Sequence, residues 1–172
     1  VGRETFRCIL VLIDVFSRQV WADVTKDKTP ATVEPVLRRM LLALPKKPAV
    51  ISTDKGNEWV GAVQELLDEK AIIRKTKDPA DVNALGVVDR AIQTLKKRLA
   101  ESLSEEPGEW ASRIKEVVKA YNGTPHADIH GEPEEVKSNQ VQACLVLQDN
   151  AEKLKSNQTL LETRKKQLEE KG

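Results

Sequence analysis

The stretch CILVLIDVFSRQVWADVTKDKT, residues 8–29, places an aspartate, Asp14, directly after a run of β-branched and aliphatic residues. Such a run is typical of a buried strand, and the alternating residues 18–25 predict a second strand that pairs with it as a hairpin. An unpaired carboxylate is costly to bury, so it normally has a compensating partner. We therefore expect Asp14 to face a metal ion or another cation.

Helices and strands alternate along the next hundred residues. Apolar residues at helical spacing predict helices at residues 29–44, 58–69, 86–103 and 110–121. Short apolar runs predict further strands at residues 49–54 and 71–76, and the Pro, Gly, Asn and Asp content of residues 77–86 predicts a loop. This order of elements predicts an α/β fold.

The last part of the chain has a different pattern. Residues 134–171 contain no glycine or proline, so a long helix is expected there. Its apolar residues are spaced irregularly, which favours packing on a partner or on the domain over a regular coiled coil. They are Val141, Leu145, Leu147, Leu154, Leu161 and Leu168. We expect a core domain over residues 1–136 and a helical extension over residues 137–172.

The amino-acid composition of the chain limits the classes of function that can be expected. Charged residues make up 32% of the 172 residues but the formal net charge is only +1, so a DNA-binding surface requires local clustering of basic residues. The two cysteines lack CxxC spacing, which favours a reducing compartment over a disulfide or zinc framework, and two histidines alone make a zinc site improbable. No secretory signal or membrane-spanning apolar run is visible. We expect an intracellular domain excised from a longer protein.

Three aspartates occupy positions where elements of an α/β fold can converge. Asp14 and Asp54 follow predicted strands, and Asp89 lies in the first turns of a predicted helix. Three carboxylates brought together repel one another unless divalent cations lie among them, and hard oxygen ligands suit Mg²⁺ or Mn²⁺. Two such ions could assist displacement at phosphorus. Aspartates are also common in caps and turns, which is the alternative for each residue.

LVLIDVFSRQVWADVTKDKT and STDKGNEW contain Asp14 and Asp54. They resemble the strand pair of the first aspartate and the segment of the second aspartate in the catalytic core of retroviral and retrotransposon integrases. GVVDRAIQTLKKRL is similar to the helix that carries the family's glutamate, and YNGTPHADIHGEPEEV is similar to the end of the core. The motifs cover roughly residues 8–136. The resemblance implies a ribonuclease H-like fold, with a mixed central sheet of about five strands flanked by helices and a long C-terminal helix.

The same resemblance assigns the metal-binding positions to Asp14, Asp54 and Asp89, with two Mg²⁺ or Mn²⁺ ions in the active state. The second and third aspartates are 35 residues apart (89 minus 54), within one residue of the retroviral spacing. Asp89 departs from the family, which has glutamate there. Aspartate is shorter by one C–C bond of about 1.5 Å, which places activity in doubt unless the helix lies closer to the metals. Mariner-type transposases are similar in using a third aspartate.

DNA-binding residues are expected on the helix that carries Asp89. Gln93 and Lys96, at i+4 and i+7, share its face, and the resemblance gives them contacts with the donor DNA end. Arg90 adds positive charge that could neutralise phosphates. Asn57, just after the second aspartate, either caps a helix or approaches DNA, and capping is the favoured interpretation.

The function implied is integrase chemistry: divalent-metal-dependent 3′-end processing and strand transfer with an Asp-Asp-Asp variant of the DDE triad. Expected partners are element-end and target DNA, at least one further copy of the chain, and other domains of a longer polyprotein, in the nucleus if the host is eukaryotic. A related DDE transposase or a ribonuclease H is one alternative. A catalytically weakened or silent DNA-binding or oligomerisation module is another, and metal binding separates it from an enzyme.

Overall fold

The structure is a computed structural model that describes residues 5–76, 86–106 and 108–169. The chain divides into two compact units, Val1–Tyr121 and Asn122–Gly172. This division falls earlier than the predicted domain boundary after residue 136. The functional boundary therefore stays a prediction, and the loop expected at residues 77–86 lies, apart from Gly86, outside the described residues.

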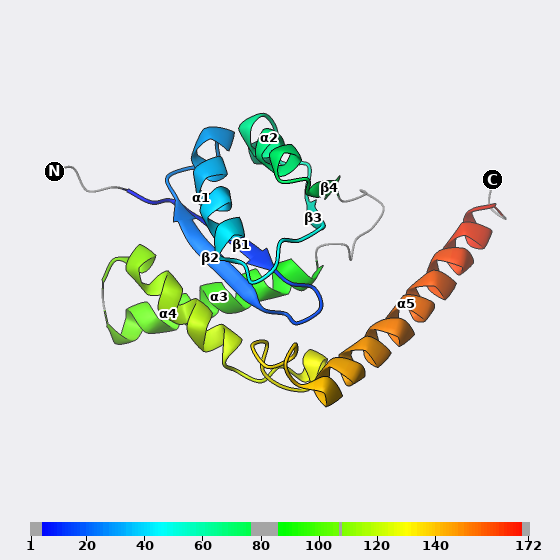
Figure 1. Cartoon of the computed structure of the whole chain (residues 1–172). Helices are drawn as coiled ribbons and strands as arrows, with labels where there is room; N and C mark the ends of the chain where they lie inside the picture. The colour runs from blue at the N-terminus through cyan, green and yellow to red at the C-terminus, as the bar shows by residue number, and fades with distance from the viewer. Residues whose placement is uncertain (1–4, 77–85, 107, 170–172) are drawn as a thin grey trace. The chain divides into compact units, whose positions relative to one another are not determined.

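The first unit begins with the predicted hairpin, which is confirmed (Figure 1). Strand β1 (Cys8–Ile13) pairs antiparallel with β2 (Val20–Thr25), and the register places Ile13 opposite Val20. Arg18, in the connecting turn, has a φ of 61°, in the left-handed region that few non-glycine residues adopt. The turn therefore has a defined backbone conformation, and Asp14 is its first residue.

Helix α1 (Pro30–Ala43) follows β2 after a short connection that Asp27 organises. The Asp27 carboxylate accepts hydrogen bonds from the backbone N–H of Thr29 (2.8 Å), the Thr29 hydroxyl (2.6 Å) and the Thr32 hydroxyl (2.5 Å). The hydroxyls of Thr29 and Thr32 lower the pKa of Asp27 to about 2, because they stabilise its charged form. Pro30 occupies the first turn, where a missing N–H has no consequence.

A parallel strand pair and its connection come next. Strand β3 (Val50–Thr53) pairs with β4 (Ile73–Thr76), and the connection holds a short 3₁₀ helix, η1 (Asn57–Trp59), and helix α2 (Ala62–Glu69). The helix predicted over residues 58–69 is present and ends at Glu69, but it begins at Ala62 because residues 57–59 form a separate 3₁₀ turn. Gly61, with a φ of 55°, turns the backbone between η1 and α2, a conformation that glycine adopts without steric penalty.

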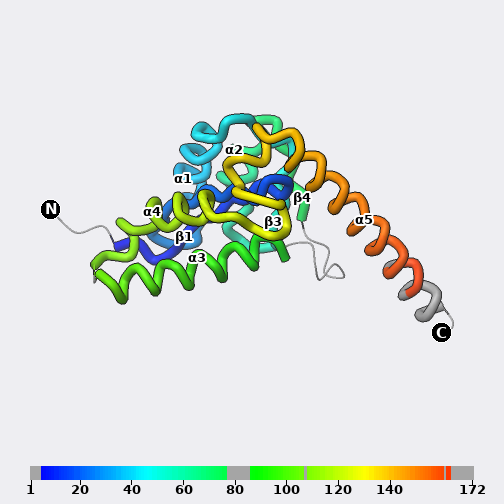
Figure 2. The backbone as a smooth tube through the Cα atoms, turned by 90° about the horizontal axis from the view of Figure 1, so that it is seen from below, coloured from blue at the N-terminus to red at the C-terminus, as the bar shows by residue number. Residues whose placement is uncertain are grey.

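The β1–β2 hairpin lies between two helical layers (Figure 2). Helices α1 and α2 form one layer, and their buried residues join Leu10 of β1 in a single apolar cluster. Helices α3 (Gly86–Glu105) and α4 (Trp110–Asn122) form the other layer, with Val20 and the odd-numbered residues of β1 in a second cluster. The predicted mixed α/β architecture is therefore confirmed, since strands lie between helices on both sides.

The strand count differs from the expectation of about five. The described residues contain four strands, arranged as two two-stranded sheets that no ladder joins. The sequence has no room for a third hairpin strand, because only residues 26–29 separate β2 from α1. The Asp14 N–H donates a hydrogen bond to the Gln19 carbonyl (2.9 Å). Backbone groups of successive residues point to opposite edges of a strand, so the even-numbered residues of β1 form hydrogen bonds with β2. The backbone groups of the odd-numbered residues therefore point to the edge of β1 that faces away from β2. That edge pairs with no described strand, and such an edge can accept one.

The second unit contains a short 3₁₀ helix, η2 (Ala127–Ile129), and the long helix α5 (Gln140–Glu169). The predicted long helix is confirmed, but it begins at Gln140 rather than near residue 134. Asn139 caps it, because its side-chain oxygen accepts a hydrogen bond from the backbone N–H of Gln142 (3.1 Å). None of the helices in the described ranges has the length and apolar content needed to span a membrane.

Candidate active site

Asp14 is half-buried at the end of β1, and its carboxylate holds the turn to β2. Oδ1 accepts a hydrogen bond from the backbone N–H of Phe16 (3.1 Å), and Oδ2 accepts one from the hydroxyl of the fully buried Ser17 (2.8 Å). The Asp14 carbonyl also accepts the N–H of Arg18 (2.7 Å). These bonds offset much of the cost of partial burial, so the structure gives Asp14 a role in the turn whether or not it also binds a metal.

Asp54 is exposed and follows β3 directly, as predicted. Its Oδ1 accepts two hydrogen bonds, from the backbone N–H of Gly56 (3.1 Å) and from the indole Nε1–H of Trp59 (2.9 Å). Both of these hydrogen bonds are accepted by Oδ1 of Asp54. The turn thus fixes the orientation of the carboxylate through Oδ1, and its position at the carboxyl end of a parallel strand is one where α/β folds often bind ligands.

Trp59 is a functional candidate that the sequence alone does not single out. Its ring packs against the cluster of α1 and α2 while its N–H holds Asp54. The guanidinium of Arg74 in β4 donates to the Trp59 carbonyl and secures the same turn from the neighbouring strand. Nothing in the sequence spacing identifies Trp59 as the donor, since the bond depends on the 3₁₀ turn of η1.

Asp89 lies in the first turn of α3 and is exposed. Gln93 and Lys96, predicted to share its face, are also exposed, whereas Ala91, Leu95 and Leu99 are buried on the opposite side. Helix α3 packs on β1, the strand that directly precedes Asp14. The face with Asp89, Gln93 and Lys96 is therefore exposed to solvent.

The other predicted polar residues have mixed outcomes. Arg90 is exposed, and its carbonyl accepts the Thr94 hydroxyl (3.0 Å). Asn57 is exposed at the start of η1, but the cap position is Gly56 and no side-chain hydrogen bond caps this helix, so the capping interpretation was wrong. This leaves the Asn57 amide available for other contacts within the described part of the chain.

The three aspartates supply hard oxygen donors, a chemistry that fits Mg²⁺ or Mn²⁺. In residues 5–76, 86–106 and 108–169, however, no group of three or more His, Cys, Asp or Glu side chains is placed to hold a metal ion. The donor chemistry therefore fits, while a ready-assembled three-ligand site is not formed by the described residues. The ligand assignment of Asp14, Asp54 and Asp89 stays a prediction.

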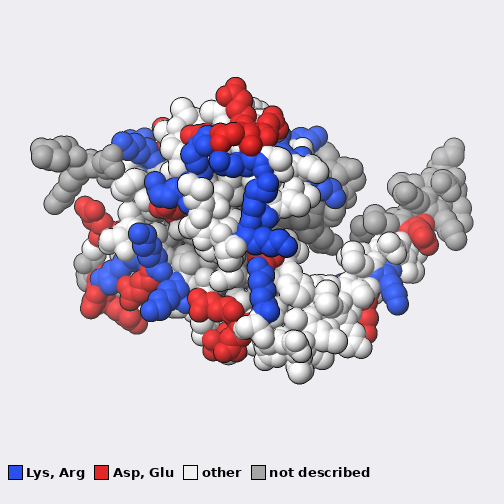
Figure 3. All heavy atoms as spheres, viewed as in Figure 1, with Lys and Arg blue, Asp and Glu red and all other residues white. Residues whose placement is uncertain are grey.

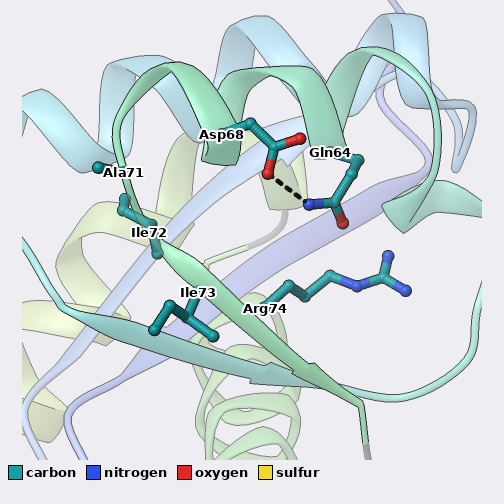
Figure 4. Close-up of a pocket in the computed structure, with 6 residues that line it drawn as sticks. All are labelled: Gln64, Asp68, Ala71, Ile72, Ile73 and Arg74. Carbon is teal, nitrogen blue, oxygen red and sulfur yellow. Dashed lines mark hydrogen bonds between the residues drawn. The ribbon is translucent and has the colours of Figure 1, made fainter.

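An open hollow of about 500 Å³ lies between α2 and β4 (Figure 4). Figure 4 shows Gln64 and Asp68 on the helix above Ile73 and Arg74 on the strand, with Gln64 Nε2 donating to Asp68 Oδ1 (2.9 Å). None of the predicted site residues lines it. The hollow therefore offers no support for the predicted chemistry.

Basic and acidic side chains are interspersed on the face of the molecule in Figure 3. This agrees with the net charge of +1. On α3, Lys97 lies 3.9 Å from Glu101 in an i,i+4 ion pair, and the Arg98 guanidinium lies over the Tyr121 ring at 5.9 Å. Lys96 is therefore the better candidate on this helix for a phosphate contact.

Comparison with solved structures decides the fold. The chain matches an integrase chain of a simian T-cell lymphotropic virus intasome with a TM-score of 0.70 and 22% identity, covering 78% of this chain and 49% of that one. It matches the catalytic core of bovine immunodeficiency virus integrase with a TM-score of 0.63 and 21% identity, over 74% of this chain and 83% of that one. The protein has the fold of a retroviral integrase catalytic core.

A third integrase core, from human T-cell lymphotropic virus 2 and solved with magnesium in a trimeric form, has a TM-score of 0.63 at 22% identity, over 76% of this chain and 84% of that one. Among curated proteins, an uncharacterized transposon-derived protein of Caenorhabditis elegans is 27% identical over 131 residues, 75% of this chain. The integrase-like chain spans 45% of that relative's length and about half of the intasome chain. No family model matches the sequence.

Proposed function

We propose that the chain is the catalytic core of an integrase-type polynucleotidyl transferase, which carries out 3′-end processing and strand transfer of DNA with a divalent metal. The observation that supports this most strongly is the integrase core fold together with the placement of the predicted acidic residues. Asp54 follows the parallel strand β3, and Asp89 lies in the first turn of the helix that packs on β1.

The residues have distinct proposed roles. Asp14, Asp54 and Asp89 bind the divalent ions, and Trp59 is a positioning residue that orients Asp54 through its 2.9 Å hydrogen bond. Lys96 and Arg90 neutralise phosphates, while Gln93 and Asn57 contact the DNA end through their amides. No covalent protein intermediate is needed, which agrees with the absence of a Ser/His or Cys/His nucleophile pattern in the sequence.

The test is the reversal of strand transfer on a branched DNA substrate with Mn²⁺, a reaction suited to an isolated core. We expect resolution of the branch with Mn²⁺ and none with EDTA. Asp14→Asn separates the two roles of that residue, because the Asn Oδ1 can still accept the Phe16 N–H, while its Nδ2 can donate to the Ser17 hydroxyl in place of the bond that Oδ2 accepts. Loss of activity at an unchanged melting temperature supports Asp14 as a ligand; unchanged activity would restrict it to the turn.

A catalytically silent, integrase-derived module is the second candidate. Two observations favour it: no three-ligand group is assembled among the described residues, and Asp89 replaces the family's glutamate. If the wild type is inactive and Asp89→Glu restores activity, the short third carboxylate is the defect. If both proteins are inactive and bind no Mn²⁺, the module interpretation replaces the enzyme.

A further inference from the structure

Helix α5 has one face that packs within its own unit. Gln142 and Val146 are buried, and the Gln142 amide donates to the carbonyls of Ile129 (2.9 Å) and Glu132 (3.4 Å). One turn further along, Asp149 Oδ2 lies 3.0 Å from His130 Nε2. Gln142, Val146 and Asp149 are at positions i, i+4 and i+7, so they lie on one face of α5. These contacts end before residue 151, so only the beginning of α5 packs against the rest of its unit.

A second stripe of α5 carries leucines at intervals of seven residues. Leu147 and Leu154 are 60% and 63% exposed, and all residues from 151 to 160 are exposed. The helix continues to Glu169, and the sequence has leucine again at positions 161 and 168. Leu147 is one residue, or about 100°, around the helix from the buried Val146, so the leucine stripe is distinct from the anchored one. The apolar residues of α5 as a whole are irregularly spaced, but these four leucines recur every seven residues, as the d positions of a coiled-coil seam do.

We propose that α5 forms a parallel, in-register, two-stranded coiled coil with a second copy of this chain. With the leucines at the d positions, the sequence places Cys144, Ala151, Gln158 and Lys165 at the a positions. A polar residue at an a position specifies register and oligomeric state at some cost in stability, which is the effect expected of Gln158. The repeat is self-complementary, because identical leucines meet at the same level in both chains.

Charges beside the seam are compatible with this arrangement. In a parallel pair, the g position of one helix faces the e position of the next heptad in the other. Asn150 then faces Lys155 of the second copy, and Asn157 faces Glu162 of the second copy. No like charges meet at these e and g positions, whereas Lys165 at an a position meets Lys165 of the second copy, which costs stability at that level.

Cys144 makes the orientation testable. In the parallel arrangement the two Cys144 residues face each other at the first a position, and an exposed thiol there can form an interchain disulfide if the Cα atoms lie about 4.4–6.8 Å apart. In an antiparallel pair each Cys144 would lie near residue 168 of the other helix. Those two positions are 24 residues apart, or about 36 Å along a helix.

The first experiment oxidises the full chain carrying Cys8→Ser with diamide, which takes two electrons and two protons from a pair of thiols. We expect a covalent dimer that forms through Cys144 and is absent when Cys144 is replaced by Ser. Failure to cross-link, or equal cross-linking of a Leu160→Cys variant in a chain without the two native cysteines, would overturn the parallel coiled coil.

The second experiment measures the dimer dissociation constant by sedimentation equilibrium. Leu147→Lys combined with Leu154→Lys should raise it about tenfold or more, whereas Leu160→Lys, at a 56% exposed position off the seam, should change it little. Circular dichroism checks that α5 remains helical in both proteins. A chain that stays monomeric, or a dimer that the seam variant leaves unchanged, contradicts the proposal, which does not depend on the proposed catalytic activity.

Discussion

Asp54→Asn is expected to abolish Mn²⁺-dependent resolution of branched DNA without unfolding the protein. Asparagine keeps an oxygen that can occupy the Oδ1 position, so the hydrogen bonds from Gly56 and Trp59 can persist. What is lost is the negative charge and the second carboxylate oxygen. Changes to outer-shell partners of metal ligands already reduce affinity or activity 10–100-fold, so loss of a ligand should reduce the rate by more than about 100-fold.

Asp68→Asn is the matched control for this variant. Asp68 is also exposed and accepts a side-chain hydrogen bond at Oδ1, in this case from Gln64, but it lies on α2 and has no predicted part in the chemistry. We expect its activity to match the wild type. Equal losses in the two variants, or full activity in Asp54→Asn, would remove Asp54 from the proposed metal set.

Leu37→Ala is expected to destabilise the first unit by about 2–5 kcal/mol, because it removes a large side chain from a packed core and leaves a cavity. Leu37 is fully buried in the cluster that joins α1, α2 and β1. Trp59 packs against the same cluster, so the turn that orients Asp54 should loosen as well.

Leu42→Ala provides the comparison within the same helix. Leu42 is 74% exposed, and its substitution by Ala changes the intrinsic helix propensity by the same amount as Leu37→Ala does. Its free energy of unfolding should stay within about 0.5 kcal/mol of the wild type in urea denaturation. Similar losses for the two variants would show that α1 does not pack as the structure has it.

The sequence was sufficient for the hairpin and for helices α1, α3, α4 and α5, because their apolar periodicity and turn residues agree with the final packing. It was misleading at η1 and at the start of α2. There Gly61 adopts a positive φ that an apolar pattern continuing through the segment does not reveal. The start of α5 was also misplaced, since Asn139 rather than the loss of Gly and Pro determines where the helix begins.

Only part of the candidate site could be predicted from the sequence. Strand ends and a helix start located Asp14, Asp54 and Asp89 correctly on their elements. The local partners of these carboxylates were not predictable, because the bonds from Ser17 and Trp59 depend on turn geometry. Strand pairing is likewise a property of long-range contacts, and the described residues form two two-stranded sheets in place of the expected single sheet of about five strands.

The most direct test of the central claim is a titration of the protein with Mn²⁺, followed by paramagnetic broadening of backbone amide signals in NMR spectra. If Asp54 and Asp89 bind one metal site, the signals of Lys55, Gly56 and Arg90 should broaden first, and Asp54→Asn should prevent this. Broadening confined to other acidic surfaces, such as the exposed Glu105 and Glu106, or none at all, would contradict a metal-dependent integrase core.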